Sequence, residues 1–308
     1  MEGVTDTIFR NSFRKYYGGV EKYFTPFLSP NKTHKFSTKE LKQIDPKTND
    51  VATTIPQLMT NKSEHFIWAL KQLIPLGYKE INFNLGCPSA TVVTKKKGSG
   101  FLAFPTELDH FLYEVFEQLP SLASDVNISI KTRLGKDDAD DFYEILDIYN
   151  KYPISELTIH PRIQTDFYKL STRPEYFSYA YEHSKIPLVY NGDLNSYNDI
   201  EKCFSKYPDI KAVMLGRGLI TRCDLAINFL SENAKNSFEL TKFFNFQNEL
   251  LESYKAEFSG DKPVLFRMKE YWSFWANNFP ENEREIKKIK KSNSIEEYKA
   301  NCALLSKR

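Results

Sequence analysis

The chain is poor in cysteine, and none of its cysteines is spaced to share a metal ion. The four cysteines are Cys87, Cys203, Cys223 and Cys302, and no two of them form a C-x-x-C pair. This spacing excludes the usual zinc signature and a disulfide framework. Reduced thiols are typical of the cytoplasm, where we expect this protein to work.

Long apolar runs and several enzyme motifs are also missing. No stretch of 18 or more apolar residues occurs, so we expect no membrane span. The opening residues Met1 to Asp6 lack the basic and apolar parts of a signal peptide. There is no H-E-x-x-H motif, which disfavours metal-dependent hydrolysis. The G-x-S-x-G and Walker motifs are also missing. The net charge is only +2, so any nucleic-acid contact must come from local basic clusters.

Short β-rich runs alternate with amphipathic helical stretches up to about residue 230. The predicted strands are Glu21–Phe24, Ala52–Leu58, Glu80–Asn84, Asn127–Thr132, Glu156–His160, Leu188–Asn191 and Ala212–Leu215. Helices are predicted near Asp6–Tyr16, Ser63–Ile74, Glu107–Leu119, Ala139–Tyr149, Pro174–His183, Tyr197–Phe204 and Cys223–Leu230. This alternation predicts a parallel sheet with right-handed crossovers.

Seven strands of this kind indicate an α/β fold of the (β/α)8 TIM-barrel class. The first strand is apparently truncated, and we expect it to lie before Met1. A doubly wound sheet is the alternative architecture. Polar residues gather at the predicted carboxyl ends of the strands, where barrel active sites lie. They are Gln57, Asn84, Cys87, Lys131, Arg133, His160, Asn191 and Asp193.

The strand pattern ends near Asn233. Apolar residues then recur at helical spacing, first from Phe243 to Phe258 and then from Leu265 to Phe279, and Pro280 and Ser294 punctuate two further helices. We therefore predict a catalytic barrel domain over residues 1–232 and a small all-α domain over residues 233–308. The aromatic stripes of that domain are interpreted as core rather than as a surface for stacking bases.

A cysteine follows the third predicted strand in a tight turn. The segment reads Asn82-Phe83-Asn84-Leu85-Gly86-Cys87-Pro88, in which Gly86 is expected to supply a positive φ and Pro88 to stiffen the exit. A buried packing cysteine is the alternative interpretation. The strand-end position favours a chemical role for Cys87.

Cations and glycine turns follow the later strands. Lys131 and Arg133 end one strand with no acidic partner nearby in sequence, and His160 ends the next. The turns Asn191-Gly192-Asp193 and Gly216-Arg217-Gly218 are suited to binding phosphate, although ordinary tight turns are the alternative. A cation-rich site with a cysteine and a phosphate cradle fits a flavin mononucleotide (FMN) enzyme. In such an enzyme Lys131 would stabilise negative charge on the reduced ring and Cys87 would donate a proton.

The chain resembles the tRNA-dihydrouridine synthase family over roughly residues 1–230, and its helical tail resembles that family's C-terminal domain. The resemblance rests on motifs that match in order and spacing: Met1 to Asp6, Asn84 to Pro88, Lys95 to Gly100, Lys131 to Arg133, His160 to Arg162, Asn191 to Asp193, and Gly216 to Gly218. Two features depart from the family. No Ala-Pro strand end precedes Met1, and Pro161 stands where many members have glycine.

The resemblance implies an oxidoreductase acting on a CH–CH group, with bound FMN and with NADPH or NADH as electron donor. It would reduce tRNA uridine to 5,6-dihydrouridine, with Cys87 protonating C5. Asn84, Arg133 and Lys95 would bind the substrate. The residues implied at the flavin are Met1, Gln57, Lys131, His160, Asn191, Gly192, Asp193, Gly216 and Arg217.

Basic residues of the tail and of the catalytic loop are the expected tRNA contacts. By the same resemblance, Arg267 and Lys269 would contact tRNA phosphates, as would Lys95, Lys96 and Lys97. The cluster Lys287, Lys288, Lys290 and Lys291 is a further candidate, with a solvated helix face as its alternative. We expect a monomer without metal and without a membrane partner. The rival functions are an FMN barrel acting on a free pyrimidine, such as a dihydroorotate dehydrogenase, and a non-catalytic RNA-binding module.

Overall fold

The computed structural model describes residues 1, 3–231 and 238–306, which form two compact units. The first unit comprises Met1–Glu2, Lys22–Asp193 and Glu201–Met214. The second comprises Gly3–Glu21, Leu194–Ile200 and Leu215–Arg308. Among the described residues, no helix combines the length and the apolar character needed to cross a membrane.

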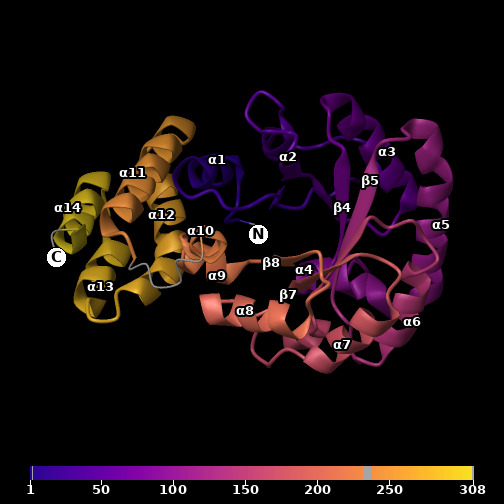
Figure 1. Cartoon of the computed structure of the whole chain (residues 1–308). Coiled ribbons are helices and arrows are strands. Elements are labelled where there is room, and N and C mark those ends of the chain that lie inside the picture. The colour runs from indigo at the N-terminus through magenta and orange to yellow at the C-terminus, as the bar shows by residue number, and fades with distance from the viewer. Residues whose placement is uncertain (2, 232–237, 307–308) are drawn as a thin grey trace. The chain divides into compact units, whose positions relative to one another are not determined.

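Parallel strands in sequence order form the first unit (Figure 1). Six of them make one sheet: β3 (Gln57–Leu58), β4 (Glu80–Leu85), β5 (Asn127–Thr132), β6 (Glu156–Ile159), β7 (Leu188–Asn191) and β8 (Ala212–Met214). The pair β1 (Tyr23–Phe24) and β2 (Thr54–Ile55) is also parallel, and Leu28 bridges to Leu58 of β3. Pro56, which has no N–H, separates β2 from β3 within the predicted strand Ala52–Leu58.

This arrangement confirms the α/β barrel class and all seven predicted strands. In the part of the chain that the structure describes, β8 and β1 are not hydrogen-bonded to each other, so no strand pairing closes the barrel at this point. Helices follow the strands: α2 (Thr38–Ile44), α3 (Ser63–Leu73), α4 (Ala90–Val93), α5 (Pro105–Leu122), α6 (Asp141–Tyr149), α7 (Pro174–His183) and α8 (Tyr197–Lys206). The short helices α2 and α4 were not predicted from the sequence.

Aromatic side chains between the strands and the outer helices form the core of the first unit. Phe83 of β4 stacks on Phe111 of α5 with ring centroids 4.7 Å apart, and Phe66 of α3 meets Phe83 edge-on. Burial of each such ring contributes about 1.5–3 kcal/mol. Because side chains alternate along a strand, Asn82 and Asn84 lie on the face of β4 opposite Phe83. The same alternation that builds the core therefore directs these two amides to the other face of the sheet.

Helices form the second unit: α1 (Thr7–Tyr16), α9 (Arg217–Thr221), α10 (Leu225–Leu230), α11 (Leu240–Glu257), α12 (Asp261–Trp275), α13 (Glu283–Lys291) and α14 (Ile295–Ser306). Trp272 and Trp275 are fully buried, and the indole N–H of Trp272 donates to the Tyr298 hydroxyl at 2.7 Å. The aromatic stripes are thus core, as predicted. The unit also includes α1, whose Phe9 packs edge-on against Phe246 of α11. The domain boundary at residue 232 stays a prediction.

Candidate active site

Cys87 lies two residues after β4, in a turn that Asn84 holds in place. The Asn84 side-chain oxygen accepts hydrogen bonds from the backbone N–H groups of Gly86 and Cys87, both at 3.0 Å. The prediction that Gly86 adopts a positive φ is wrong, because its φ lies outside that region. A β-carbon added at Gly86 would make only ordinary contacts, the nearest at 3.6 Å. The side chain of Asn84, rather than a left-handed glycine, therefore shapes the turn.

Buried amides connect this turn to two neighbouring strands. Asn84 donates to the Gln57 side-chain oxygen at 2.7 Å, and Gln57 donates in turn to Asn82 at 2.8 Å. Asn82 completes the series by donating to the Ser129 hydroxyl at 3.0 Å. We call this series, Ser129–Asn82–Gln57–Asn84, the amide ladder. Each amide group has two N–H donors, so Gln57 and Asn84 each retain one beyond these bonds. The contacts predicted for Gln57 with the flavin and for Asn84 with the base would use these remaining N–H groups.

A second segment, which contains Gly98 and Ser99, holds Cys87 through its backbone carbonyl. The Ser99 backbone N–H and hydroxyl donate to the Cys87 carbonyl at 3.1 and 2.8 Å. Gly98 has a φ of +55°, and a β-carbon there would lie 2.8 Å from the Cys87 carbonyl oxygen. Close packing therefore accounts for this glycine of the Lys95–Gly100 motif.

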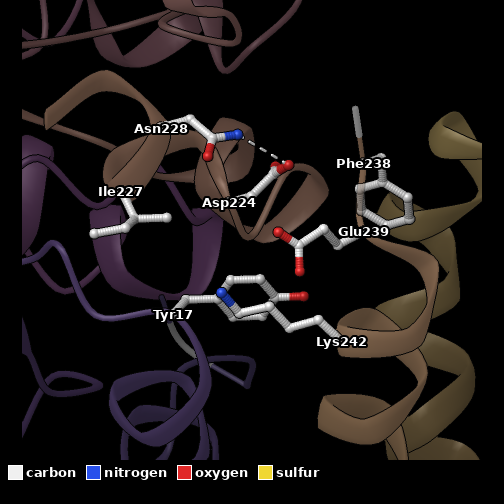
Figure 2. A pocket seen from close by; sticks show the side chains of 7 residues that line it. All are labelled: Tyr17, Asp224, Ile227, Asn228, Phe238, Glu239 and Lys242. Atoms are coloured by element: carbon white, nitrogen blue, oxygen red, sulfur yellow. Dashed lines mark hydrogen bonds between the residues drawn. The ribbon is translucent and has the colours of Figure 1, made fainter. Parts of the chain in front are cut away.

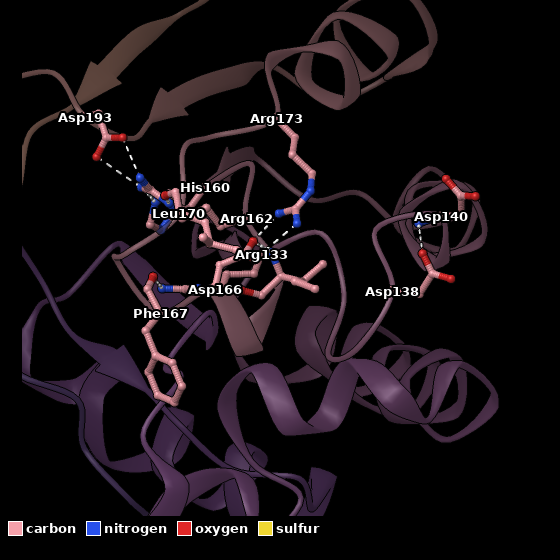
Figure 3. A network of polar contacts seen from close by, with 11 residues as sticks. Arg133, Asp138, Asp140, His160, Arg162, Asp166, Phe167, Leu170, Arg173 and Asp193 are labelled. Carbon is pink, nitrogen blue, oxygen red and sulfur yellow. Dashed lines mark hydrogen bonds and ion pairs between the residues drawn. The ribbon is translucent and has the colours of Figure 1, made fainter.

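Arg133 is buried and holds two loops together. Its guanidinium donates to the carbonyls of Gly86 at 3.1 Å, Ile163 at 2.6 Å and Phe167 at 2.7 Å, and the residue has 0% exposure. Figure 3 shows Arg133 together with Phe167, one of its three partners. No part of Arg133 is exposed in this conformation, in which its guanidinium supports the Cys87 turn. Direct contact with substrate stays a prediction.

Lys131, on β5, has no carboxylate partner among the described residues. In register it lies between Asn84 of β4 and Thr158 of β6. Burial and the charge of Arg133 lower the pKa of Lys131 to about 7, while Cys87 raises it, which indicates that the thiol is near. The Thr158 hydroxyl is buried and also lacks a hydrogen-bond partner. A cation and a hydroxyl left unsatisfied at adjacent positions fit an electron-rich ligand such as a flavin ring.

His160 is joined to an arginine that the sequence analysis named only within a motif. Arg162 Nη1 lies 2.9 Å from His160 Nε2, and because guanidinium nitrogens only donate, this imidazole nitrogen accepts. The Arg162 guanidinium also binds both oxygens of Asp193, at 3.1 and 2.5 Å (Figure 3). Asp193 therefore holds Arg162. Its predicted contact with the cofactor stays a prediction.

The two glycine turns differ in what their glycines do. A β-carbon at Gly192 would lie 2.9 Å from Thr172 and 3.2 Å from the His160 ring, which explains glycine there. A β-carbon at Gly218 would lie 2.1 Å from the Leu194 carbonyl oxygen, so packing against that backbone requires this glycine. Asn191 donates to the Met214 carbonyl at 2.8 Å and ties β7 to β8.

The remaining predicted flavin contacts lie at less informative positions. Gly216 caps the five-residue helix α9, and Arg217 is its first residue. Met1 is 39% exposed. Flavin contacts of these three residues stay predictions.

The tail cations expected to bind tRNA are already paired. Arg267 donates to Glu270 at 3.0 Å and lies 3.9 Å from Asp6, and its side chain is only 16% exposed. The Lys269 ammonium donates to the Ser292 carbonyl. Both side chains therefore have intramolecular partners, and their contact with tRNA phosphates stays a prediction. By contrast, Lys95, Lys96 and the four lysines of α13 are exposed.

A pocket in the second unit contains none of the predicted site residues. It is lined by Tyr17, Asp224, Ile227, Asn228, Phe238, Glu239 and Lys242, and Figure 2 shows Lys242 beside the Tyr17 ring. Two carboxylates in this lining make it a poor site for RNA phosphates. Within the described ranges, no group of three His, Cys, Asp or Glu residues could hold a metal ion.

Comparison with known proteins gives a consistent result. The family model described as dihydrouridine synthase matches residues 1–307. A tRNA-dihydrouridine(16) synthase of Vibrio vulnificus is 26% identical over 313 residues, covering 97% of this chain and 94% of that protein. The Vibrio parahaemolyticus protein of the same description is 29% identical over 229 residues, covering 72% of this chain and 68% of its own length.

A solved structure shares the fold. The 6-hydroxypseudooxynicotine amine oxidase of Pseudomonas geniculata superposes with a TM-score of 0.51 at 9% identity, covering 74% of this chain and 44% of that one. At this identity the likeness concerns the fold alone.

Proposed function

The chain belongs to the dihydrouridine synthase family, and on that premise we propose that it reduces uridine in tRNA to 5,6-dihydrouridine with the aid of bound FMN. The observation that carries the proposal is the position of Cys87. Its turn is held by Asn84 on one side and by Ser99 on the other, beside the unpaired cation Lys131. NADPH or NADH would be the electron donor.

The residues proposed to hold FMN surround this turn or follow the last strands. Gln57, Lys131 and His160 would contact the ring, and Asn191, Gly192, Asp193, Gly216 and Arg217 would hold the ribityl and phosphate groups. Met1 is a further proposed contact of the cofactor. The unpaired charge of Lys131 and the unpaired hydroxyl of Thr158 support this assignment. Bound FMN would supply the hydride that C6 of the uracil receives.

Cys87 would donate the proton that C5 of the uracil receives. A positioned acid of this kind contributes about 10²–10⁴-fold to the rate. The nearby Lys131 ammonium would stabilise the thiolate that remains after the transfer. Asn84 would bind the target base with its remaining N–H, and Arg133 would keep the turn in place. The uridine must leave its stack to reach this site, at a cost of a few kcal/mol.

The exposed lysines are the cations that we propose for tRNA phosphates. Lys95 and Lys96 follow the Cys87 turn, and Lys287, Lys288, Lys290 and Lys291 lie exposed on α13. Arg267 and Lys269 are not included, because intramolecular partners already occupy them.

The test is to incubate the purified protein with NADPH and tRNA that lacks dihydrouridine, and to measure dihydrouridine by mass spectrometry of the digested RNA. We expect conversion at a defined uridine, and flavin absorbance in the purified protein. Free uracil and orotate serve as controls for the rival enzyme. Reduction of a free pyrimidine without any change in tRNA would overturn the proposal.

A further inference from the structure

An exposed histidine stacks on a tryptophan near the active site. The His34 ring lies nearly parallel to the Trp68 ring, with an interplanar angle of 16° and centroids 5.4 Å apart. His65 meets His34 edge-on at 5.8 Å, and Phe36 packs against Trp68 at 4.8 Å. His34 and Phe36 come from the loop after β1, and His65 and Trp68 from the first turns of α3. We call His34, Phe36, His65 and Trp68 the aromatic patch.

The loop that carries His34 is built to hold the ring outward. His34 has a φ of +49°, an uncommon conformation for a residue other than glycine. The Asn31 side chain accepts from the Thr33 N–H at 2.9 Å, and the Asn31 carbonyl accepts from the His34 N–H at 2.9 Å. Glu40 accepts from the Ser29 N–H at 2.7 Å, so this carboxylate is used to anchor the loop. One face of the exposed imidazole is covered by Trp68, and the ring is held on the surface rather than in the core.

Lysines without carboxylate partners surround the patch. Burial lowers the pKa of His65, Glu64 opposes this effect, and His34, Lys97 and Lys62 add to it. Burial and the neighbouring Lys95 likewise lower the pKa of Lys97, which Glu40 raises. Lys62, Lys95 and Lys97 have no ion pair within the described part of the chain, whereas Lys22, Lys79 and Lys151 of the same unit each pair with a carboxylate. The patch is thus an aromatic surface with three lysines beside it that have no ion pair, and with Glu64 next to His65.

The patch lies on the side of the barrel that carries Cys87. Its two segments follow β1 and β3, and the Lys95–Lys97 segment follows the Cys87 turn after β4. The carboxyl ends of parallel strands in a barrel meet at one face. The Asn61 side chain donates to the Lys95 carbonyl at 3.2 Å, which joins the start of α3 to the catalytic loop.

We propose that the aromatic patch and Lys62 form a second RNA-binding site, which holds a nucleotide of the tRNA outside the target uridine. An unstacked base lies on the free face of His34, and Lys62 binds an adjacent phosphate together with Lys95 and Lys97. Stacking on a ring is tolerant of base identity, because every base has a π face. The site deepens the proposed function and rests on it, since it assumes a tRNA substrate.

The test measures tRNA binding by His34→Ala, His34→Phe and Lys62→Gln as a function of salt. Loss of one stacked base should weaken binding by roughly 5- to 150-fold in His34→Ala, while leaving the salt slope unchanged. His34→Phe supplies another ring and should bind as the wild type does. Lys62→Gln should reduce the log–log salt slope by roughly 0.7–0.9, the share of one phosphate contact.

The matched control is Lys47→Gln with Lys71→Gln, which removes two exposed lysines, one in the turn after α2 and one in the last turn of α3. Its affinity and salt slope should equal those of the wild type. Equal affinity in His34→Ala and wild type, with normal dihydrouridine formation in both, would overturn this site and leave the proposed function intact. A wild-type protein that neither binds nor modifies tRNA would overturn both.

Discussion

Gly98 packs directly against Cys87, and a β-carbon at position 98 would come within 2.8 Å of the Cys87 carbonyl oxygen and 3.0 Å of its Cβ. The first distance is shorter than real β-carbons show, and the second is tighter than most of their contacts. The position of the proposed acid therefore depends on a residue eleven positions later in the chain that has no side chain at all.

Gly98→Ala should displace Cys87 and slow uridine reduction. A displacement of about 1 Å at a reacting group can cost about 100-fold in rate. The positive φ of Gly98 adds strain to any substitution there. The measurement is the single-turnover rate of dihydrouridine formation at equal flavin content. Gly86→Ala is the control, because a β-carbon there meets nothing nearer than 3.6 Å. Equal rates in the two variants would contradict this account of the turn.

Cys87→Ala should retain flavin and fold but lose about 10²–10⁴-fold in the rate of uridine reduction. Removal of the thiol takes away the proton donor and leaves the backbone bonds of the turn in place. Flavin absorbance and the rate with tRNA are measured on the same sample. Cys203→Ala is the matched control, since burial raises the pKa of Cys203 to about 11 and the residue lies outside the site. A wild-type rate in Cys87→Ala would remove Cys87 from the mechanism.

Arg133→Met should destabilise the first unit by roughly 1–3 kcal/mol. The substitution leaves the carbonyls of Gly86, Ile163 and Phe167 without their donor, and the bond to Ile163 is the buried one of the three. The free energy of unfolding is measured in urea. Arg284→Met, at an exposed position of α13, should change it by less than about 0.5 kcal/mol. A stable Arg133→Met protein with slow catalysis would instead support direct substrate contact.

The unpaired Lys131 should make stability depend on pH. Its pKa is about 7 in the folded chain and 10.5 ordinarily, so between these values the unfolded chain binds more protons. Stability then rises with pH across this window, and below pH 7 the full cost of burying the charge remains. In the flavin-free protein, the stability of the wild type relative to Lys131→Met should rise from pH 7 to 10. A difference that stays flat over this range would contradict the burial of a charged lysine.

Arg267→Gln should lower stability without changing the salt slope of tRNA binding. Its guanidinium is paired with Glu270 and lies near Asp6, so these carboxylates already offset the positive charge that a phosphate would need. Lys287→Gln with Lys291→Gln should instead reduce the log–log slope by roughly 1.4–1.8, since both lysines are exposed. Melting temperature and the salt dependence of binding are measured for each. A reduced slope in Arg267→Gln would restore the original assignment.

The strands and the location of Cys87 could be predicted because their signals are local. Alternation along Glu80–Leu85 and the turn that follows are visible within nine residues of sequence. The partners of the cations are not local. Asp6, which lies near Arg267 and accepts from the Tyr254 hydroxyl, is 248 positions from that tyrosine. Lys131 and Arg133 likewise look alike in sequence, and only the fold shows that Arg133 bonds three carbonyls while Lys131 is left unpaired.

The glycines show the same limit. From the sequence, the positive φ was predicted for Gly86, and Gly98 was named only within the Lys95–Gly100 motif. The backbone uses Asn84 to close the first turn and reserves the left-handed conformation for Gly98. The difference depends on which neighbour packs against each glycine, which a single sequence does not contain.

The amide ladder has a consequence for how the site tolerates change. Ser129, Asn82, Gln57 and Asn84 transmit the position of one strand to the next, and the last of them sets the Cys87 backbone. Gln57, proposed to contact the flavin, and Asn84, proposed to contact the base, are thus positioned by the same series of hydrogen bonds. A substitution at Ser129, which is fully buried, would be felt at both. The Ser129 hydroxyl, which is not among the proposed ligand contacts, therefore limits which substitutions the site can tolerate.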